Sequence, residues 1–78
     1  MKYVYILESE EGGHFYADLT NDLRKRLDKH NNGEAPHTSK FKPWQLKTYL
    51  AFANPDQAAK FERYLKSPSG RAFAKKRL

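Results

Sequence analysis

The sequence predicts a small α+β fold of the broad α/β class, with its elements in the order ββαβαα. Two short runs of tyrosine and β-branched residues near the N-terminus flank a Gly-Gly pair, as in a β-hairpin. Two later segments place apolar residues three and four positions apart, as in amphipathic helices, and an apolar run lies between them. A chain of 78 residues is expected to form one domain over residues 1–78.

The first two strands are expected at residues 2–7 and 14–17, where tyrosine, valine, isoleucine and phenylalanine cluster. The segment between them, Glu-Ser-Glu-Glu-Gly-Gly, is rich in residues that form turns. With a four-residue loop at 9–12, Tyr5 is expected to lie opposite Tyr16 on the paired strands.

The first helix is expected to begin at a capping residue, Thr20 or Asn21, and to end near Asn31, before an Asn-Gly pair. A helical turn of about 3.6 residues places four side chains on one face. That face is expected to point inward, and it holds Leu23, Arg26, Leu27 and His30.

A polar loop with two prolines follows at residues 32–43, and loops of this length are often functional. The third strand is expected at 44–52, with Trp44 packed in the core. Asn54-Pro55 begins the second helix, with Gln57 placed for a capping box. The segment at 67–70, Ser-Pro-Ser-Gly, ends this helix and begins a short basic helix through residues 71–77.

A carboxylate interrupts the apolar face of the second helix, where Ala58, Phe61, Glu62 and Leu65 share one side. Burying an unpaired charge costs several kcal/mol, which is comparable to the whole stability of a small domain. Glu62, and likewise Arg26 and His30 on the first helix, therefore require a partner, a metal ion or a hydrated cleft.

The composition excludes several classes of protein. Without cysteine there is no disulfide framework, cysteine zinc site or thiol catalysis, and no apolar run reaches the roughly 18 residues of a membrane span. We therefore expect a cytoplasmic protein. The net charge of +6 comes from residues 60–78, which contain seven basic residues and one acidic residue, Glu62. Residues 1–59 contain equal numbers of basic and acidic residues. Such a basic segment favours a polyanion such as nucleic acid, although it can also be a solvated helix end.

Several of these residues, in their order and spacing, resemble the GIY-YIG nuclease family. The matching segments are Tyr3-Val4-Tyr5-Ile6-Leu7, Phe15-Tyr16-Ala17, Arg26, His30-Asn31 and Phe61-Glu62-Arg63. The likeness is greatest to small stand-alone bacterial proteins related to the N-terminal nuclease domain of the excision-repair nuclease. It implies a three-stranded antiparallel sheet flanked by helices. It also implies a metal-dependent endonuclease that hydrolyses DNA, with a role in repair or recombination and with Mg²⁺ or Mn²⁺ as cofactor.

The resemblance implies catalytic roles for Tyr5, Tyr16, Arg26, His30 and Glu62. Glu62 matches the metal ligand, because a carboxylate is the hard oxygen donor that Mg²⁺ prefers. Arg26 offers a planar cationic fork to a phosphate, and Tyr16, as a phenolate, would take a proton from water. Each residue also has an ordinary structural interpretation: an ion pair between Glu62 and Arg26, packing tyrosines, and a buried structural histidine.

A second group of cations is expected to contact nucleic acid, DNA more than RNA. It contains Lys40, Lys42, Lys66, Arg71, Lys75 and Lys76. So small a domain has little surface for reading sequence, so a protein partner is a further expectation.

The likeness breaks at Asp18, where the second motif of the family ends in glycine. A carboxylate here either repels the scissile phosphate or contributes to the metal site. Leu19, where relatives often carry a polar residue, removes another favourable contact. Two alternatives therefore stay open: a nucleic-acid-binding module with impaired catalysis, and a protein-interaction domain that uses the aromatic residues of the sheet.

Overall fold

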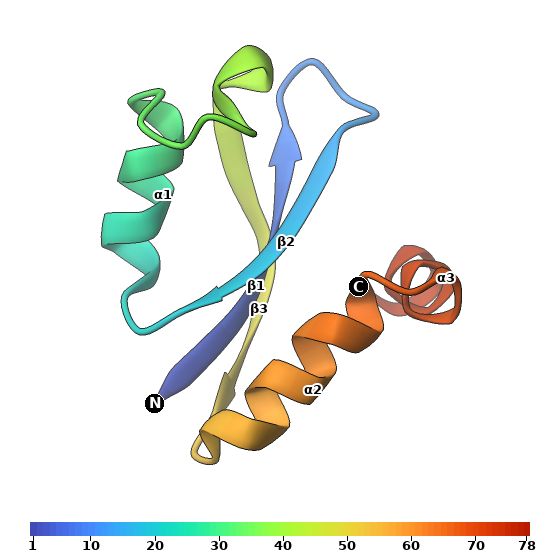
Figure 1. Cartoon of the computed structure of the whole chain (residues 1–78). Helices are drawn as coiled ribbons and strands as arrows, with labels where there is room; N and C mark the ends of the chain where they lie inside the picture. The colour runs from blue at the N-terminus through green and yellow to red at the C-terminus, as the bar shows by residue number, and fades with distance from the viewer.

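The computed structural model describes all residues 1–78, and it confirms the order ββαβαα (Figure 1). The strands are β1 (Lys2–Ser9), β2 (Phe15–Thr20) and β3 (Trp44–Phe52). The helices are α1 (Leu23–Asn31), α2 (Pro55–Leu65) and α3 (Pro68–Arg77), and a short 3₁₀ turn, η1 (Ser39–Phe41), precedes β3. No helix has the length and apolar character needed to cross a membrane.

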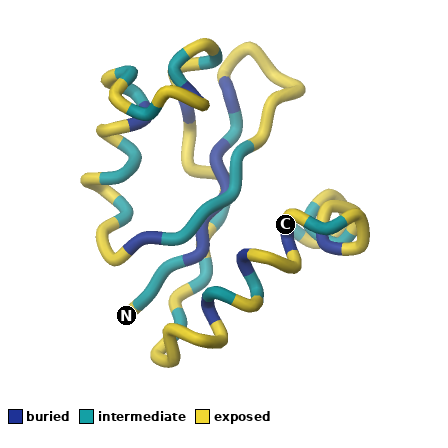
Figure 2. Tube along the Cα trace, in the orientation of Figure 1, coloured by how far each residue is buried: buried dark blue, intermediate teal, exposed yellow.

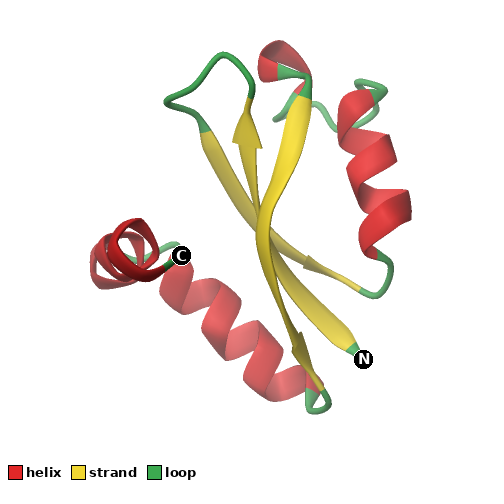
Figure 3. Ribbon diagram, turned by 180° about the vertical axis from the view of Figure 1, so that it is seen from behind, coloured by secondary structure: helices red, strands yellow, loops and turns green.

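The three strands form one antiparallel sheet in the order β2-β1-β3, as the resemblance implied (Figure 3). The central strand β1 is the most buried element, and Val4 to Leu7 form a continuous buried stretch through the middle of the molecule (Figure 2). Both β2 and β3 are edge strands, so each pairs with β1 along one side only.

The predicted register of the hairpin is wrong by two residues. Tyr5 lies opposite Asp18, and Tyr16 lies opposite Leu7. The cause is a turn displaced by one residue along the chain, because the Ser9 N–H donates to the His14 carbonyl and residues 10–13, with two glycines at φ of 78° each, form the loop. Side chains alternate across a strand, so a shift of two residues keeps Tyr16 on the predicted face of the sheet. It also brings Asp18, rather than Tyr16, directly beside Tyr5.

Each face of the sheet carries its own small core. On one face, Tyr5, Leu7 and Trp44 are buried against the apolar side of α1, which confirms the predicted core position of Trp44. On the other face, Val4 and Ile6 pack with residues of α2 and α3. The helices therefore lie on opposite sides of the sheet, α1 on one side and α2 with α3 on the other (Figures 1 and 3).

The helices begin at side-chain caps, one of which differs from the prediction. Asp22, rather than Thr20 or Asn21, caps α1 by accepting a hydrogen bond from the backbone N–H of Lys25. The α2 cap is Asn54, whose side chain accepts from two backbone N–H groups at the start of the helix. The Ser67 hydroxyl accepts from the Gly70 N–H at 3.1 Å and begins α3.

The predicted loop at 32–43 is tied to the rest of the fold by two residues at its ends. The Trp44 indole N–H donates to the Thr38 carbonyl oxygen at 2.8 Å, and the Asn31 side chain donates to the Trp44 carbonyl. Thr38 is consequently buried and lies against the C-terminal end of α1. The loop thereby closes the inner side of α1, where His30 lies.

Candidate active site

Tyr5 and His30 begin a chain of buried hydrogen bonds between β1, α1 and the loop. The Tyr5 hydroxyl lies 3.0 Å from His30 Nε2, and His30 Nδ1 lies 2.7 Å from the Thr38 hydroxyl oxygen. The Thr38 hydroxyl in turn donates to the Ala35 carbonyl. Since that hydroxyl proton is used, Thr38 accepts from Nδ1–H, and His30 Nε2 accepts from Tyr5. The histidine is thereby assigned as a neutral Nδ1–H tautomer.

Burial holds both groups of this chain in their neutral forms. Desolvation, with a further contribution from the Arg26 charge, lowers the pKa of His30 below its usual 6.5. Desolvation and the charge of Asp18 raise the pKa of Tyr5 well above its usual value of 10.0. Tyr5 and His30 are each about 1% exposed. In this conformation, both ring nitrogens of His30 make hydrogen bonds within the protein, as expected for a buried structural histidine.

Tyr16 lies next to this chain and donates to a carboxylate. Its ring meets the His30 ring edge-on, with centroids 5.1 Å apart. The Tyr16 hydroxyl donates to Asp18 Oδ2 at 2.8 Å. Desolvation, with the Asp18 hydrogen bond as the second cause, raises the pKa of Tyr16 to about 12. This shift is opposite to the one that a phenolate would need, so Tyr16 is a neutral hydroxyl at physiological pH.

The Asp18 carboxylate is held by two hydrogen bonds from residues of its own strand, β2. Its Oδ2 accepts from Tyr16, and its Oδ1 accepts from the Leu19 backbone N–H at 2.8 Å. The position therefore holds a fixed carboxylate where the family motif has glycine. The charge of Asp18 nevertheless reaches across the site, because it contributes to the raised pKa values of Tyr5 and Lys66.

Glu62 lies on α2, which packs on the opposite face of the sheet from α1 and contacts both β1 and the edge strand β2. It is 8% exposed, as expected for the inner face of the helix, and its charge adds to the raised pKa of Tyr16. Its ion-pair partner is Lys66, one helical turn later, and the hydrogen bond with Glu62 raises the pKa of Lys66. The ion pair between Glu62 and Arg26, which the sequence left open as an alternative, is not formed.

Arg26 acts electrostatically on both tyrosines. It is half-buried on the inner side of α1, and its charge acts against the raised pKa values of Tyr5 and Tyr16. It also lines a polar hollow outside this cluster. A guanidinium in this position has both a buried and a solvent-facing side, which suits it to an anion that arrives from solvent.

The donor set fits a divalent ion with few protein ligands. No group of three or more His, Cys, Asp and Glu side chains comes together in the fold. The site therefore does not suit zinc, which takes three or four such ligands in proteins. Mg²⁺ commonly takes one or two carboxylates and otherwise binds water and substrate phosphate. Glu62 can provide that carboxylate once Lys66 moves away.

The predicted nucleic-acid-binding cations are spread over three places. Lys40 lies in η1 and Lys42 directly follows it. Lys66 is paired with Glu62. The other three lie on α3, across the sheet from α1: Arg71, Lys75 and Lys76.

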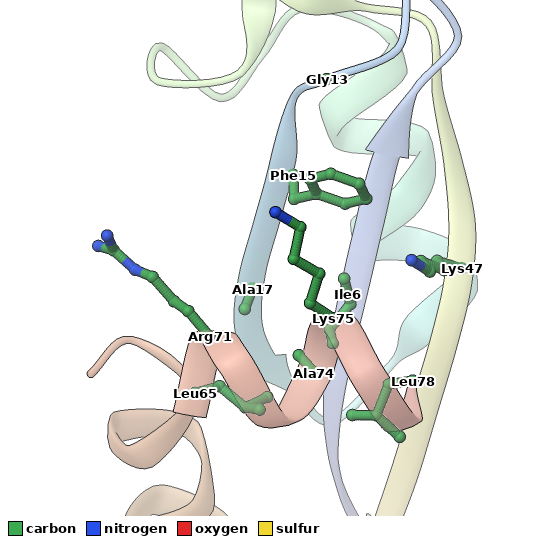
Figure 4. A pocket seen from close by; sticks show the side chains of 10 residues that line it. All are labelled: Ile6, Gly13, Phe15, Ala17, Lys47, Leu65, Arg71, Ala74, Lys75 and Leu78. Atoms are coloured by element: carbon green, nitrogen blue, oxygen red, sulfur yellow. The ribbon is translucent and has the colours of Figure 1, made fainter. Parts of the chain in front are cut away.

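A hollow that is mostly apolar lies under α3 (Figure 4). Its volume is about 360 Å³, with Ile6, Ala17 and Leu65 in its wall and Arg71 and Lys75 at its border. It contains none of the candidate catalytic residues, so its size does not mark it as the site of chemistry.

Two features of the site were missed in the sequence. Lys25 and Lys29 line the polar hollow beside Arg26, but the charge balance of residues 1–59 concealed them. The local density of charge reveals them, because α1 has four basic residues and only Asp28 as an acidic one. The second is the bond between Tyr16 and Asp18, for which an i, i+2 spacing on one strand was an available signal.

The fold is a small antiparallel sheet flanked by helices, with two tyrosines, an arginine and a buried glutamate at the motif positions of a nuclease family. The model of the GIY-YIG catalytic domain matches residues 1–77. The chain therefore belongs to the GIY-YIG family, as the sequence motifs predicted.

Similar chains are small stand-alone members of this family. The UPF0213 protein BH0048 of Halalkalibacterium halodurans is 36% identical over 70 residues, which cover 88% of this chain and 73% of that protein. The UPF0213 protein CPE1444 of Clostridium perfringens is 39% identical over 67 residues, covering 85% and 71%. The solution NMR structure of BH0048, from Bacillus halodurans, matches with a TM-score of 0.58 at 34% identity, over 96% of this chain and 81% of that one. A UPF0213 protein of Bacillus pumilus is matched over 66% of its length.

Proposed function

We propose that this protein is a metal-dependent endonuclease that hydrolyses phosphodiester bonds in DNA. The observation that carries the proposal is the convergence on Tyr16 of charged groups from three elements. Its pKa responds to Asp18 of β2, Arg26 of α1 and Glu62 of α2. Electrostatic coupling among titratable groups, beside the hydrogen bond from Tyr16 to Asp18, is typical of catalytic sites. Membership of a nuclease family supports the same conclusion.

Arg26 binds the phosphate that is cut. Its guanidinium is permanently charged and offers parallel N–H donors, which suit two phosphate oxygens. During hydrolysis negative charge grows on those oxygens, so the interaction strengthens toward the transition state. The half-buried position of Arg26 makes its charge more effective than that of an exposed lysine.

Tyr16 and Asp18 take the proton of the attacking water together. The water donates to Tyr16 Oη while the Tyr16 hydroxyl proton passes to Asp18 Oδ2 along the existing 2.8 Å hydrogen bond. The water oxygen bonds to phosphorus, the bond to the leaving oxygen breaks, and that oxygen is protonated by solvent. Tyr16 is neutral before and after the step, so its raised pKa is no obstacle.

Tyr5 and His30 support this arrangement from behind. Their hydrogen bond joins β1 to α1 beneath the site, which fixes the inner face of α1 and hence Arg26. Their catalytic contribution is therefore through position, since both are buried in this conformation.

Glu62 would hold the Mg²⁺ or Mn²⁺ ion, which would supply positive charge beside the reacting phosphate. The Lys66 ammonium is the resting partner of Glu62, and on metal binding it becomes free to contact a backbone phosphate.

Weak sequence preference follows from the small surface of the domain. The cations of η1 and α3, including Lys40, Lys42 and Lys75, provide contacts to phosphates that carry no sequence information. We propose that DNA shape or a protein partner selects the site, in DNA repair or recombination.

A second function is favoured by Asp18: binding of nucleic acid without cleavage. Its fixed carboxylate lies where an anionic substrate must approach, and unneutralised repulsion would exclude the scissile phosphate. In this case the domain binds DNA through its cations and has lost hydrolysis.

Nicking of supercoiled plasmid in Mn²⁺ separates the two functions. The endonuclease predicts nicking by the wild-type protein and at least a tenfold loss in Asp18→Gly. The binding module predicts salt-sensitive binding without nicking, and nicking that appears in Asp18→Gly. Binding is measured in parallel with a labelled duplex, so that loss of cleavage is distinguished from loss of binding.

A further inference from the structure

A polar hollow of about 220 Å³ opens at the surface beside the candidate active site. It lies at the beginning of α1 and contains no apolar side chain. It is lined by Thr20, Asp22, Lys25, Arg26 and Lys29. It differs in character from the larger apolar hollow under α3.

The three cations of this hollow have no acidic partner. The single ion pair of the protein joins Lys66 to Glu62. Asp22, the one carboxylate in the hollow, is engaged as the cap of α1 through the Lys25 backbone N–H at 3.1 Å. Lys25 and Lys29 are exposed and four residues apart on one side of the helix, a spacing at which like charges repel. An anion from solvent would relieve this repulsion.

Arg26 connects the hollow to the catalytic cluster. The same side chain lines the hollow and acts on the ionisation of Tyr5 and Tyr16. An anion bound in the hollow would therefore lie next to the phosphate that Arg26 binds beside the two tyrosines. In a nucleic acid, the anion next to a scissile phosphate is another backbone phosphate.

We infer that Lys25 and Lys29, with the outer side of Arg26, bind a DNA backbone phosphate adjacent to the one that is cut, so that the strand runs along α1. The inference rests on the proposed function for its cleavage step, but the binding requires no cleavage. It assigns the principal DNA contact to α1, whereas the sequence assigned DNA contacts to Lys40, Lys42, Lys66 and the basic residues of α3.

The test compares two double variants with equal loss of charge, Lys25→Gln/Lys29→Gln on α1 and Lys75→Gln/Lys76→Gln on α3. Glutamine has nearly the helix propensity of lysine, and both helices keep their caps. Binding of a fluorescein-labelled DNA duplex is followed by anisotropy over a series of KCl concentrations. Urea unfolding midpoints equal to the wild type establish that both variants are folded.

The inference predicts a loss in affinity of about tenfold or more for the α1 variant, and a fall of about 2 in the slope of log K against log salt. For the α3 variant, the loss in affinity and the fall in the salt slope are each expected to be less than half of those for the α1 variant. Equal losses in the two variants, or a larger loss on α3, would overturn the inference.

Plasmid nicking separates this inference from the proposed function. If the wild type nicks, the α1 variant is expected to raise KM with kcat nearly unchanged, as for loss of uniform binding. If the wild type does not nick, the proposed function fails, and the binding comparison still decides the role of α1. If nicking occurs and both double variants bind alike, only the assignment to α1 is wrong.

Discussion

The Tyr16 hydroxyl donates a 2.8 Å hydrogen bond to Asp18, at the position where the second motif of the family ends in glycine. The substitution therefore changes the hydrogen bonding of a candidate catalytic group. Desolvation, with this hydrogen bond as the second cause, raises the pKa of Tyr16 to about 12, and Asp18 gives the hydroxyl proton a defined acceptor. Asp18 thus distinguishes this site from one in which a tyrosine phenolate accepts the proton.

Asp18→Asn is expected to reduce kcat for plasmid nicking by about 10², which is the lower range for loss of general-base catalysis. The amide keeps the size of the side chain and can still contact Leu19, but it cannot accept a proton at neutral pH. KM is expected to change less than threefold. The measurement is the initial nicking rate over a range of plasmid concentrations.

Asp28→Asn is the matched control for this variant. Asp28 is exposed on the outer side of α1 and carries the same charge. An Asp18→Asn rate equal to that of Asp28→Asn would refute the role of Asp18 as proton acceptor. A faster rate for Asp18→Asn would instead favour charge repulsion of the substrate.

Tyr5→Phe is expected to destabilise the protein by about 1–3 kcal/mol, because it leaves buried His30 Nε2 without its donor. Tyr64→Phe is the control. Tyr64 is 40% exposed, its ring still packs on α2 and α3, and its hydroxyl makes no hydrogen bond within the protein, so we expect a change within about 0.5 kcal/mol. Urea unfolding at pH 7.5 measures both. Equal stabilities would show that the buried chain of hydrogen bonds contributes little.

Stability is expected to fall as the pH is lowered, because of His30. Burial places the folded-state pKa of His30 below 6.5, so the unfolded chain binds this proton more readily. The contribution is therefore complete above about pH 6.5 and is lost as the pH falls below it. We expect a lower urea midpoint at pH 5.5 than at pH 7.5, and a smaller difference in His30→Gln. The same difference in both proteins would exclude His30 as the cause.

Helical periodicity predicted which side chains of the candidate site point inward, and the position of the turn altered the strand register. The inner faces of α1 and α2 followed from helical spacing alone, which placed Arg26, His30 and Glu62 correctly. Strand register depends on where the turn begins, and the turn with its two glycines at positive φ occupies residues 10–13, one residue later than predicted. The sequence could not reveal that Asp18, rather than Tyr16, faces Tyr5.

The partner of Glu62 shows another limit of sequence reasoning. Lys66 is four residues later on the same helix, and that spacing was visible. A long lysine side chain can point to water or fold back to a carboxylate, and the choice depends on the burial of Glu62. The net charge summed over residues 1–59 also concealed the cations of α1, because acidic residues elsewhere in that stretch balance them.

Gly70→Ala is expected to destabilise the protein by about 2 kcal/mol or more. A Cβ at this position would lie 1.7 Å from the Tyr64 carbonyl oxygen, so α3 must move away from the end of α2. Ser69→Ala, on the exposed side of the same turn, is expected to change stability by less than about 0.5 kcal/mol. Thermal or urea unfolding provides the comparison. If the two variants unfold alike, the close contact between these helices is not a constraint on stability.

Nicking of supercoiled plasmid by Glu62→Gln in Mn²⁺, beside the wild type and Glu34→Gln, tests the central proposal most directly. Glu34 is exposed in the loop after α1, so its variant loses the same charge outside the site. We predict that the wild type and Glu34→Gln nick the plasmid, whereas Glu62→Gln binds DNA but nicks at least 10²-fold more slowly. Absence of nicking by the wild type, or equal nicking by all three proteins, would contradict the assignment of a metal-dependent nuclease centred on Glu62.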